Sequence, residues 1–140
     1  MDFIASHSLW IGHAGDGRNV RAICNRGIEA VLQLATEEPS LVLPREILQF
    51  RIPIFDGEGN ERSRLRLAVK VLSHLIESRV PTLVCCSARA SRSPAIAALA
   101  IAQLEKRTPQ ESLKFIREHH PTDVSPGLWN ELLTCFTEDR

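Results

Sequence analysis

A short segment in the second half of the chain combines residue types that could perform covalent chemistry on an anion. Cys86 ends an apolar run, and Arg92 follows six positions later. The residues between them are small except for one arginine: Ser87, Ala88, Arg89, Ala90 and Ser91. Small side chains allow a loop to curl so that its backbone N–H groups point inward and bind an anion. The segment therefore offers a nucleophilic thiol beside a guanidinium that can hold two phosphate oxygens.

The elements expected on either side place this loop where ligands commonly bind. Pro81–Cys86 is a short apolar strand, and a helix is expected to begin at Arg92, with Pro94 in its first turn. In open α/β sheets, ligands bind beyond the carboxyl ends of strands, often against a helix N-terminus. The positive end of that helix would attract a tetrahedral phosphate and favour the thiolate form of Cys86.

Three of these residues also have simpler interpretations. Cys86 could be an inert core cysteine, since free cysteine is often buried. Arg92 could be a solvated arginine at the start of a helix, and Ser93 could serve only as an N-cap. The context favours the chemical interpretation, because Cys86 alone among the four cysteines has a strand before it, small residues after it and an arginine at this spacing.

Short apolar strands and amphipathic helices alternate along the rest of the chain. The expected strands are Leu9–His13, Glu29–Leu34, Ile47–Phe55, in which Pro53 indicates an end or an edge position, and Pro81–Cys86. The expected helices run from an Asp16 cap to Gly27, from Glu61 to Arg79, from Arg92 to Leu104, from a Thr108 cap, and from Ser125. The apolar positions of the second helix, which recur at helical spacing, are Leu65, Val69, Leu72 and Ile76. This alternation predicts an α/β fold with a central, mostly parallel mixed sheet and helices on both faces.

Composition limits the class of protein. A chain of 140 residues with 44% hydrophobic residues fits one domain, residues 1–140, with its own core. Lys plus Arg and Asp plus Glu are both 17, which predicts neither a nucleic-acid nor a membrane partner. No N-terminal signal pattern and no apolar stretch of about 20 residues occurs, so we expect a cytoplasmic protein. The cysteines lack the paired spacing of a zinc site, so we expect free thiols, no metal, and buried packing positions for Cys24 and Cys135.

The segment around Cys86 resembles the phosphate-binding loop of the cysteine-dependent protein tyrosine phosphatases, particularly the dual-specificity branch. The usual form of that loop is H-C-x-A-G-x-S-R-S, and the stretch compared with it is Cys85-Cys86-Ser87-Ala88-Arg89-Ala90-Ser91-Arg92-Ser93. The likeness continues in three flanking regions, namely Leu9–Gly12, Gly27–Leu34, and His120-Pro121 followed by Trp129. The resemblance implies a phosphatase fold over most of the chain.

The resemblance also implies roles for individual residues. Cys86 would attack phosphorus to form a phosphocysteine, with Arg92 binding the phosphate and Ser93 assisting release of the sulfur. Asp56 is the best candidate for the general acid, because it follows the Ile47–Phe55 strand in a Gly-flanked loop that could move over the site. Glu58 is the rival acid, and Asp56 could instead be an ordinary turn residue. The family needs no metal or cofactor.

Two positions depart from the family pattern. Cys85 replaces the usual histidine and is a poor hydrogen-bond donor, so activation of Cys86 is expected to be weaker. Arg89 replaces the usual glycine and would add positive charge at the mouth of the site, which favours acidic or multiply phosphorylated substrates. The adjacent Cys85 and Cys86 also raise the hypothesis of oxidative inactivation through a vicinal disulfide.

Together these observations predict a protein phosphatase that acts on phosphotyrosine, with phosphoserine and phosphothreonine left open. Its partner would be a phosphorylated protein or peptide, and a phosphate or sulfate ion could occupy the loop. The alternative is a weakly active or inactive phosphatase-like domain that binds phosphate or phosphoprotein. Thiol redox chemistry is less favoured, because the usual dithiol spacing of two intervening residues is absent.

Overall fold

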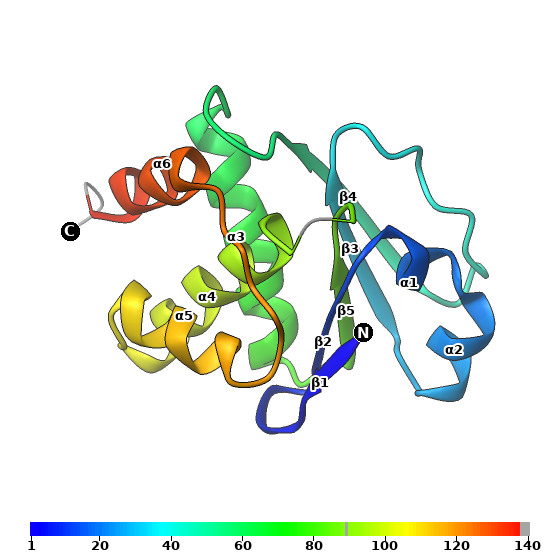
Figure 1. Cartoon of the computed structure of the whole chain (residues 1–140). Helices are drawn as coiled ribbons and strands as arrows, with labels where there is room; N and C mark the ends of the chain where they lie inside the picture. The colour runs from blue at the N-terminus through cyan, green and yellow to red at the C-terminus, as the bar shows by residue number, and fades with distance from the viewer. Residues whose placement is uncertain (89, 138–140) are drawn as a thin grey trace.

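A five-stranded sheet forms the centre of the protein in the computed structural model, which describes residues 1–88 and 90–137 (Figure 1). The strands, in their order across the sheet, are β1 (Asp2–Ile4), β2 (Leu9–Gly12), β5 (Thr82–Cys85), β3 (Ala30–Ala35) and β4 (Leu48–Ile54). β1 pairs antiparallel with β2, and the other pairs are parallel. The expected mostly parallel mixed sheet is confirmed. Sequence reasoning missed β1, which is too short to show a strand periodicity.

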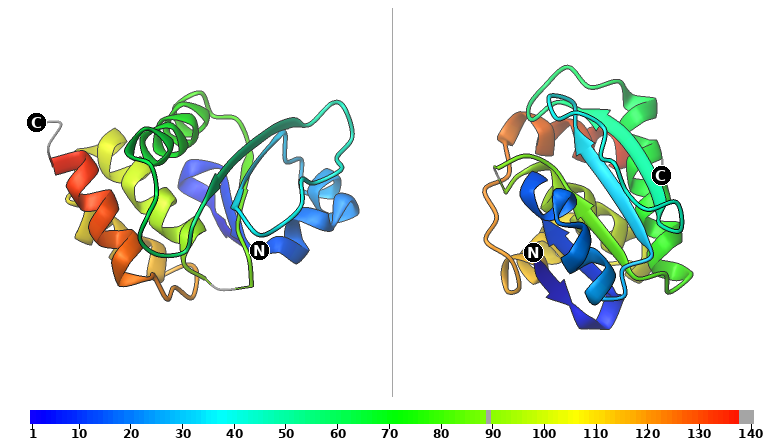
Figure 2. Two further views of the ribbon diagram at one scale, coloured as in Figure 1. Left: turned by 90° about the horizontal axis from the view of Figure 1, so that it is seen from above. Right: turned by 90° about the vertical axis from the view of Figure 1, so that its right-hand side faces the viewer.

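Helices cover both faces of this sheet (Figures 1 and 2). The two short helices on one face are α1 (Ala14–Arg18) and α2 (Val20–Asn25). The four helices on the opposite face are α3 (Arg62–Glu77), α4 (Arg92–Glu105), α5 (Pro109–Arg117) and α6 (Pro126–Thr137), and a 3-10 turn, η1 (Ala5–His7), joins β1 to β2. Among the described residues, no helix is both long and apolar enough to cross a bilayer.

Separate apolar clusters fill the two sides of the sheet. The larger cluster lies between the sheet and helices α3, α4 and α6, and it contains the predicted apolar face of α3: Leu65, Val69, Leu72 and Ile76. Helix α4 is buried over almost its whole length and is rich in alanine, a strong helix former that lets neighbouring elements approach closely. The smaller cluster, on the face of α1 and α2, includes Trp10, Ile23 and Leu83.

The helix expected from Asp16 to Gly27 is instead two helices. The side chain of His13 caps α1 by accepting a hydrogen bond from the Gly15 N–H, and Asn19 caps α2 by accepting from the Ala22 N–H. Asp16 therefore does not cap the second helix. Its carboxylate lies in the first turn of α1 and accepts from the His13 N–H at 2.9 Å. The two local caps interrupt a continuous helix because they offer the backbone alternative partners.

Other expectations have mixed outcomes. Gly27 follows α2 with φ +71°, as expected for a residue that ends a helix. Pro53 lies in β4, the edge strand, where a missing N–H is tolerated. Cys135 is buried, but Cys24 is exposed, so the prediction of a packing role for Cys24 is wrong. The reason is that the short helix α2 buries only Ile23.

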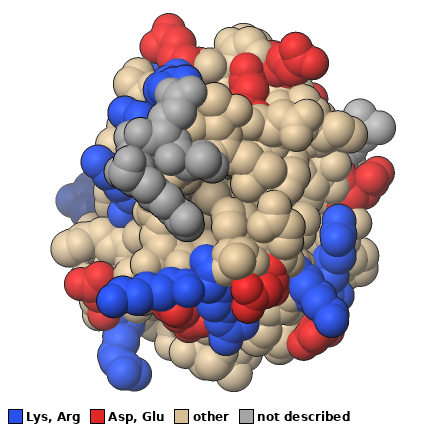
Figure 3. Space-filling view, turned by 90° about the vertical axis from the view of Figure 1, so that its left-hand side faces the viewer, with Lys and Arg blue, Asp and Glu red and all other residues tan. Residues whose placement is uncertain are grey.

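Charged side chains lie mainly around the edge of the face seen in Figure 3, and uncharged residues cover much of its centre. This face carries α5 and α6, which lie on the left in Figure 1. Both basic and acidic groups lie around this edge.

Candidate active site

The loop from Cys86 to Ser91, called here the 86–91 loop, connects β5 to α4. Strand β5 is the middle strand of the sheet, so the 86–91 loop leaves from the centre of the row of strand carboxyl ends. Cys86 is only 2% exposed and joins the larger apolar cluster. Helix α4 begins at Arg92, as predicted, with Ser91 at the N-cap position. The structure thus places a buried thiol at the junction of a central strand and a helix N-terminus.

Arg92 is buried and its side chain folds back across this loop. Its Nη2 donates to Ser87 Oγ at 2.8 Å, and its Nη1 donates to the carbonyl of Ile54, the last residue of β4, at 3.1 Å. The residue is 1% exposed, so the alternative of a solvated surface arginine is wrong. The guanidinium therefore lies next to the residue that follows Cys86, where an anion bound by the loop would meet it.

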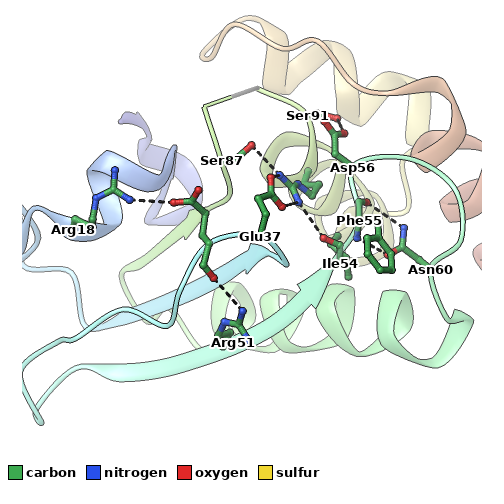
Figure 4. A network of polar contacts seen from close by, with 11 residues as sticks. Arg18, Glu37, Arg51, Ile54, Phe55, Asp56, Asn60, Ser87 and Ser91 are labelled. Atoms are coloured by element: carbon green, nitrogen blue, oxygen red, sulfur yellow. Dashed lines mark hydrogen bonds and ion pairs between the residues drawn. The ribbon is translucent and has the colours of Figure 1, made fainter.

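Glu37 forms a bidentate ion pair with this arginine (Figure 4). Its two carboxylate oxygens accept from Arg92 Nη1 at 2.6 Å and from Arg92 Nη2 at 2.5 Å. The hydrogen bond from Arg92 holds the pKa of Glu37 down at about 2. Burial opposes the charge of Arg92, but the hydrogen bond and charge of Glu37 outweigh it and raise the pKa of Arg92, with smaller contributions from Cys86 and Asp56. Glu37 is therefore ionised at neutral pH and fixes the orientation of the guanidinium.

The contacts of Arg92 leave one edge of its guanidinium facing the loop. Glu37 takes one N–H of Nη1 and one of Nη2, and Ile54 takes the remaining N–H of Nη1. The second N–H of Nη2, on the side of Nε, points to Ser87. Nε itself is buried and has no hydrogen-bond partner among the described residues. An oxyanion in the loop could accept from Nε and, by displacing the Ser87 hydroxyl, from Nη2.

Asp56 lies against the other end of the 86–91 loop. Its Oδ1 accepts a hydrogen bond from Ser91 Oγ at 2.6 Å, and the same hydroxyl oxygen accepts from the Ser125 N–H at 2.9 Å. The rival acid, Glu58, packs elsewhere: its Cγ lies 2.7 Å from where a Cβ on Gly127 of α6 would be. Asp56 therefore contacts the 86–91 loop, in addition to any local turn role, whereas Glu58 lies against α6.

The residues from Asp56 to Asn60 form a loop, called here the 56–60 loop, that several hydrogen bonds hold in place. Asn60 Oδ1 accepts from the Phe55 N–H at 2.7 Å, and Asn60 Nδ2 donates to the carbonyls of Phe55 and Gly57. Figure 4 shows Asn60 beside Phe55, at the base of the loop that carries Asp56. The loop that the sequence suggests could move over the site is thus braced beside it in this structure.

Cys85 precedes Cys86 in the sequence, and Ser93 follows Arg92. Ser93 is buried, and its Oγ donates to the Gly12 carbonyl at 3.5 Å, so the interpretation of Ser93 as only an N-cap is wrong. Burial raises the pKa of Cys85 to about 12, which keeps that thiol neutral. Cys85 packs in the smaller apolar cluster and Cys86 in the larger one, on the opposite face of the sheet. This alternation disfavours the hypothesised disulfide between them, since its sulfurs must meet on one side.

The remaining residues of the loop have different outcomes. Ala88 is exposed, and the carbonyl of Ala90 accepts from the Asp123 N–H at 2.7 Å, which ties the loop to the segment before α6. Arg89 lies outside the described residues, so its expected effect on substrate charge stays a prediction. Sequence reasoning did not find Glu37, although one signal was available: it follows the buried strand β3 at the same sheet edge as the 86–91 loop.

The fold of this protein is similar to that of solved structures described as dual specificity or tyrosine phosphatases. Human DUSP28 matches with a TM-score of 0.84 over 99% of this chain and 96% of its own, at 18% identity. A mouse putative dual specificity phosphatase, solved with zinc tungstate, matches with a TM-score of 0.81 over 94% of this chain and 83% of its own, at 18% identity.

A third similar structure is a human tyrosine phosphatase-like serine/threonine/tyrosine-interacting protein. Its TM-score is 0.81 over 94% of this chain and 93% of its own, at 14% identity. No family model and no curated protein matches the chain by sequence. The expected fold is therefore confirmed by structure, and the chemistry depends on the residues described above.

Proposed function

We propose that the protein hydrolyses phosphomonoesters of tyrosine, and of serine or threonine, through a phosphocysteine intermediate. The observation that carries this proposal is the position of Arg92, whose buried guanidinium bends back to Ser87, beside Cys86. On the same edge, its Nε–H has no hydrogen-bond partner among the residues that the structure describes. Asp56 adds a carboxyl group at the last residue of the loop. A nucleophile, an oxyanion ligand and an acid thus surround one loop.

In the proposed reaction, the Cys86 thiolate attacks phosphorus and the S–P bond forms as the P–O bond to the leaving group breaks. Asp56 gives its proton to the departing oxygen. The carboxylate of Asp56 then takes a proton from water, which attacks phosphorus and releases inorganic phosphate with the thiolate restored. Arg92 and the backbone N–H groups of the loop hold the phosphoryl oxygens throughout, and Ser93 donates to the departing sulfur.

A pre-steady-state assay with p-nitrophenyl phosphate tests this proposal. We expect a burst of p-nitrophenolate from the natural protein and none from Cys86→Ser, whose folding is checked by circular dichroism. Asp56→Ala is expected to lose rate chiefly with phenyl phosphate, whose leaving group needs protonation, by roughly 10²-fold or more. An equal loss on both esters would move the acid role away from Asp56.

The second candidate is a domain that binds phosphate or phosphoprotein with little or no turnover. Two observations favour it. The carboxylate of Glu37 pairs with the positive charge of Arg92, and Cys85 offers no effective hydrogen-bond donor at the position where the family usually has histidine. One similar structure is named as a tyrosine phosphatase-like interacting protein, so this fold is not limited to proteins named as phosphatases. Calorimetric binding of inorganic phosphate without any burst would select this candidate.

A further inference from the structure

Glu131, on the last helix, directs its carboxylate at the 56–60 loop. Its Oε2 accepts from the Gly59 N–H at 2.8 Å, and its Oε1 accepts from the Asn60 N–H and from Asn60 Nδ2, both at 3.2 Å. One side chain therefore satisfies two backbone donors and one side-chain amide donor of residues that lie 71 and 72 positions earlier in the chain. No sequence motif predicted a role for Glu131.

The loop needs such support because its own backbone is permissive. Gly57 has φ +156° and Gly59 has φ +96°, both in the positive-φ region that favours glycine. Two glycines give a free loop many conformations, and ordering it costs entropy. Asn60 organises the inner turn through Phe55 and Gly57, and Glu131 fixes Asn60 from outside.

Helix α6 meets the site at further points. Glu58 packs against Gly127 in the first turn of α6, which leaves no room for a Cβ there. The Ser125 N–H, just before the helix, donates to the hydroxyl of Ser91 that holds Asp56. Beside these contacts lies a cleft of about 460 Å³, lined in part by Glu131 and Asn130.

We propose that Glu131 is a positioning residue for Asp56: with Asn60, it holds the 56–60 loop so that the acid faces the 86–91 loop. This inference rests on the proposed function of Asp56. Because Glu131 hydrogen-bonds to the loop that carries Asp56, and Asp56 is proposed to protonate the leaving group, removing the Glu131 carboxylate should reproduce the kinetic signature of losing the acid. Substrate binding through Arg92 should be little affected.

The experiment compares Glu131→Ala and Glu131→Gln with Asn130→Ala. Asn130 is a suitable control because it is exposed on the same helix and lines the same cleft. On phenyl phosphate we expect kcat to fall roughly 10-fold or more in Glu131→Ala, with less than about a 3-fold fall on p-nitrophenyl phosphate and an unchanged KM. Glu131→Gln, which retains one acceptor oxygen, should fall between Glu131→Ala and the natural protein.

Two further measurements separate the inference from the proposed function. In an Asp56→Ala background, Glu131→Ala should cause no further loss on phenyl phosphate, since the acid it positions is absent. Amide hydrogen exchange should be faster at Gly59 and Asn60 in Glu131→Ala than in Asn130→Ala, a readout that needs no activity. If neither the natural protein nor any variant turns over substrate, but amide exchange is faster in Glu131→Ala, the proposed function is wrong while the role of Glu131 in holding the loop is supported.

Other results would overturn the inference itself. Unchanged exchange at Gly59 and Asn60 in Glu131→Ala would show that the carboxylate does not hold the loop. Faster exchange with equal rate losses on both esters would show that the brace is structural only. Additive losses in the double variant would show that Glu131 acts independently of Asp56.

Discussion

The ion pair between Glu37 and Arg92 allows a stability prediction to be worked from the structure. In Glu37→Gln, the new amide oxygen still accepts a hydrogen bond from one Arg92 N–H. The amide NH₂, however, is a donor that faces the second Arg92 N–H, so this hydrogen bond is lost. The fall in the pKa of Glu37 from 4.5 to about 2 sets an upper limit of roughly 3 kcal/mol on the stability that its ionised form contributes. Because 51% of that side chain is exposed, solvent screening lowers the expected loss to roughly 1 kcal/mol.

The pH dependence follows from the lowered pKa of Glu37. A carboxyl group whose pKa is lower in the folded state stabilises the protein above its unfolded value of 4.5, and this contribution is lost as the pH falls from there toward about 2. Urea unfolding at about pH 6 should show the natural protein to be the more stable, and the difference should shrink by about pH 3. Asp16, whose pKa is also lowered, titrates in both proteins and cancels.

Glu38→Gln is the matched control for this experiment. Glu38 follows Glu37 directly, but its partner Arg18 has a side chain that is 60% exposed, and exposed pairs contribute only about 0–1 kcal/mol. Its loss should be the smaller of the two. The assignment of Glu37 as the ionised partner of Arg92 is refuted by equal stabilities of Glu37→Gln and the natural protein at about pH 6. A stability difference that does not change by about pH 3 refutes it as well.

Two further predictions concern packing around the site. Burial raises the pKa of Cys85 to about 12. Iodoacetamide at about pH 8 should therefore modify the exposed Cys24 long before Cys85 in the folded protein. Early labelling of the peptide that contains Cys85, detected by mass spectrometry, would contradict its buried position. In Gly127→Ala, the new Cβ would lie 2.7 Å from Glu58 Cγ and 3.2 Å from the Glu58 backbone N. We expect a loss of about 1–3 kcal/mol in urea unfolding, and an unchanged midpoint would mean that Glu58 moves aside.

Local features of the chain were predictable because their causes are local. The buried face of α3 follows from apolar residues at helical spacing, from Leu65 to Ile76, and the site loop follows from small residues between an apolar strand and a helix start. The prediction of one helix beginning at Asp16 was wrong for a local reason as well. His13 and Asn19 each cap a separate short helix, and neither residue gives a stronger sequence signal for a cap than Asp16 does.

The sequence by itself determined the fold class, the 86–91 loop and its candidate nucleophile, Cys86, because strand, loop and helix follow one another along the chain. Only the tertiary structure showed that Asp56, rather than Glu58, contacts the 86–91 loop, and only it brought Glu37 to Arg92. Glu37 reaches Arg92 across 55 residues, Asp56 meets Ser91 across 35, and Glu131 holds Asn60 across 71. Such pairs depend on how loops from different strands and a distant helix meet at one edge of the sheet, which no periodicity along the chain encodes.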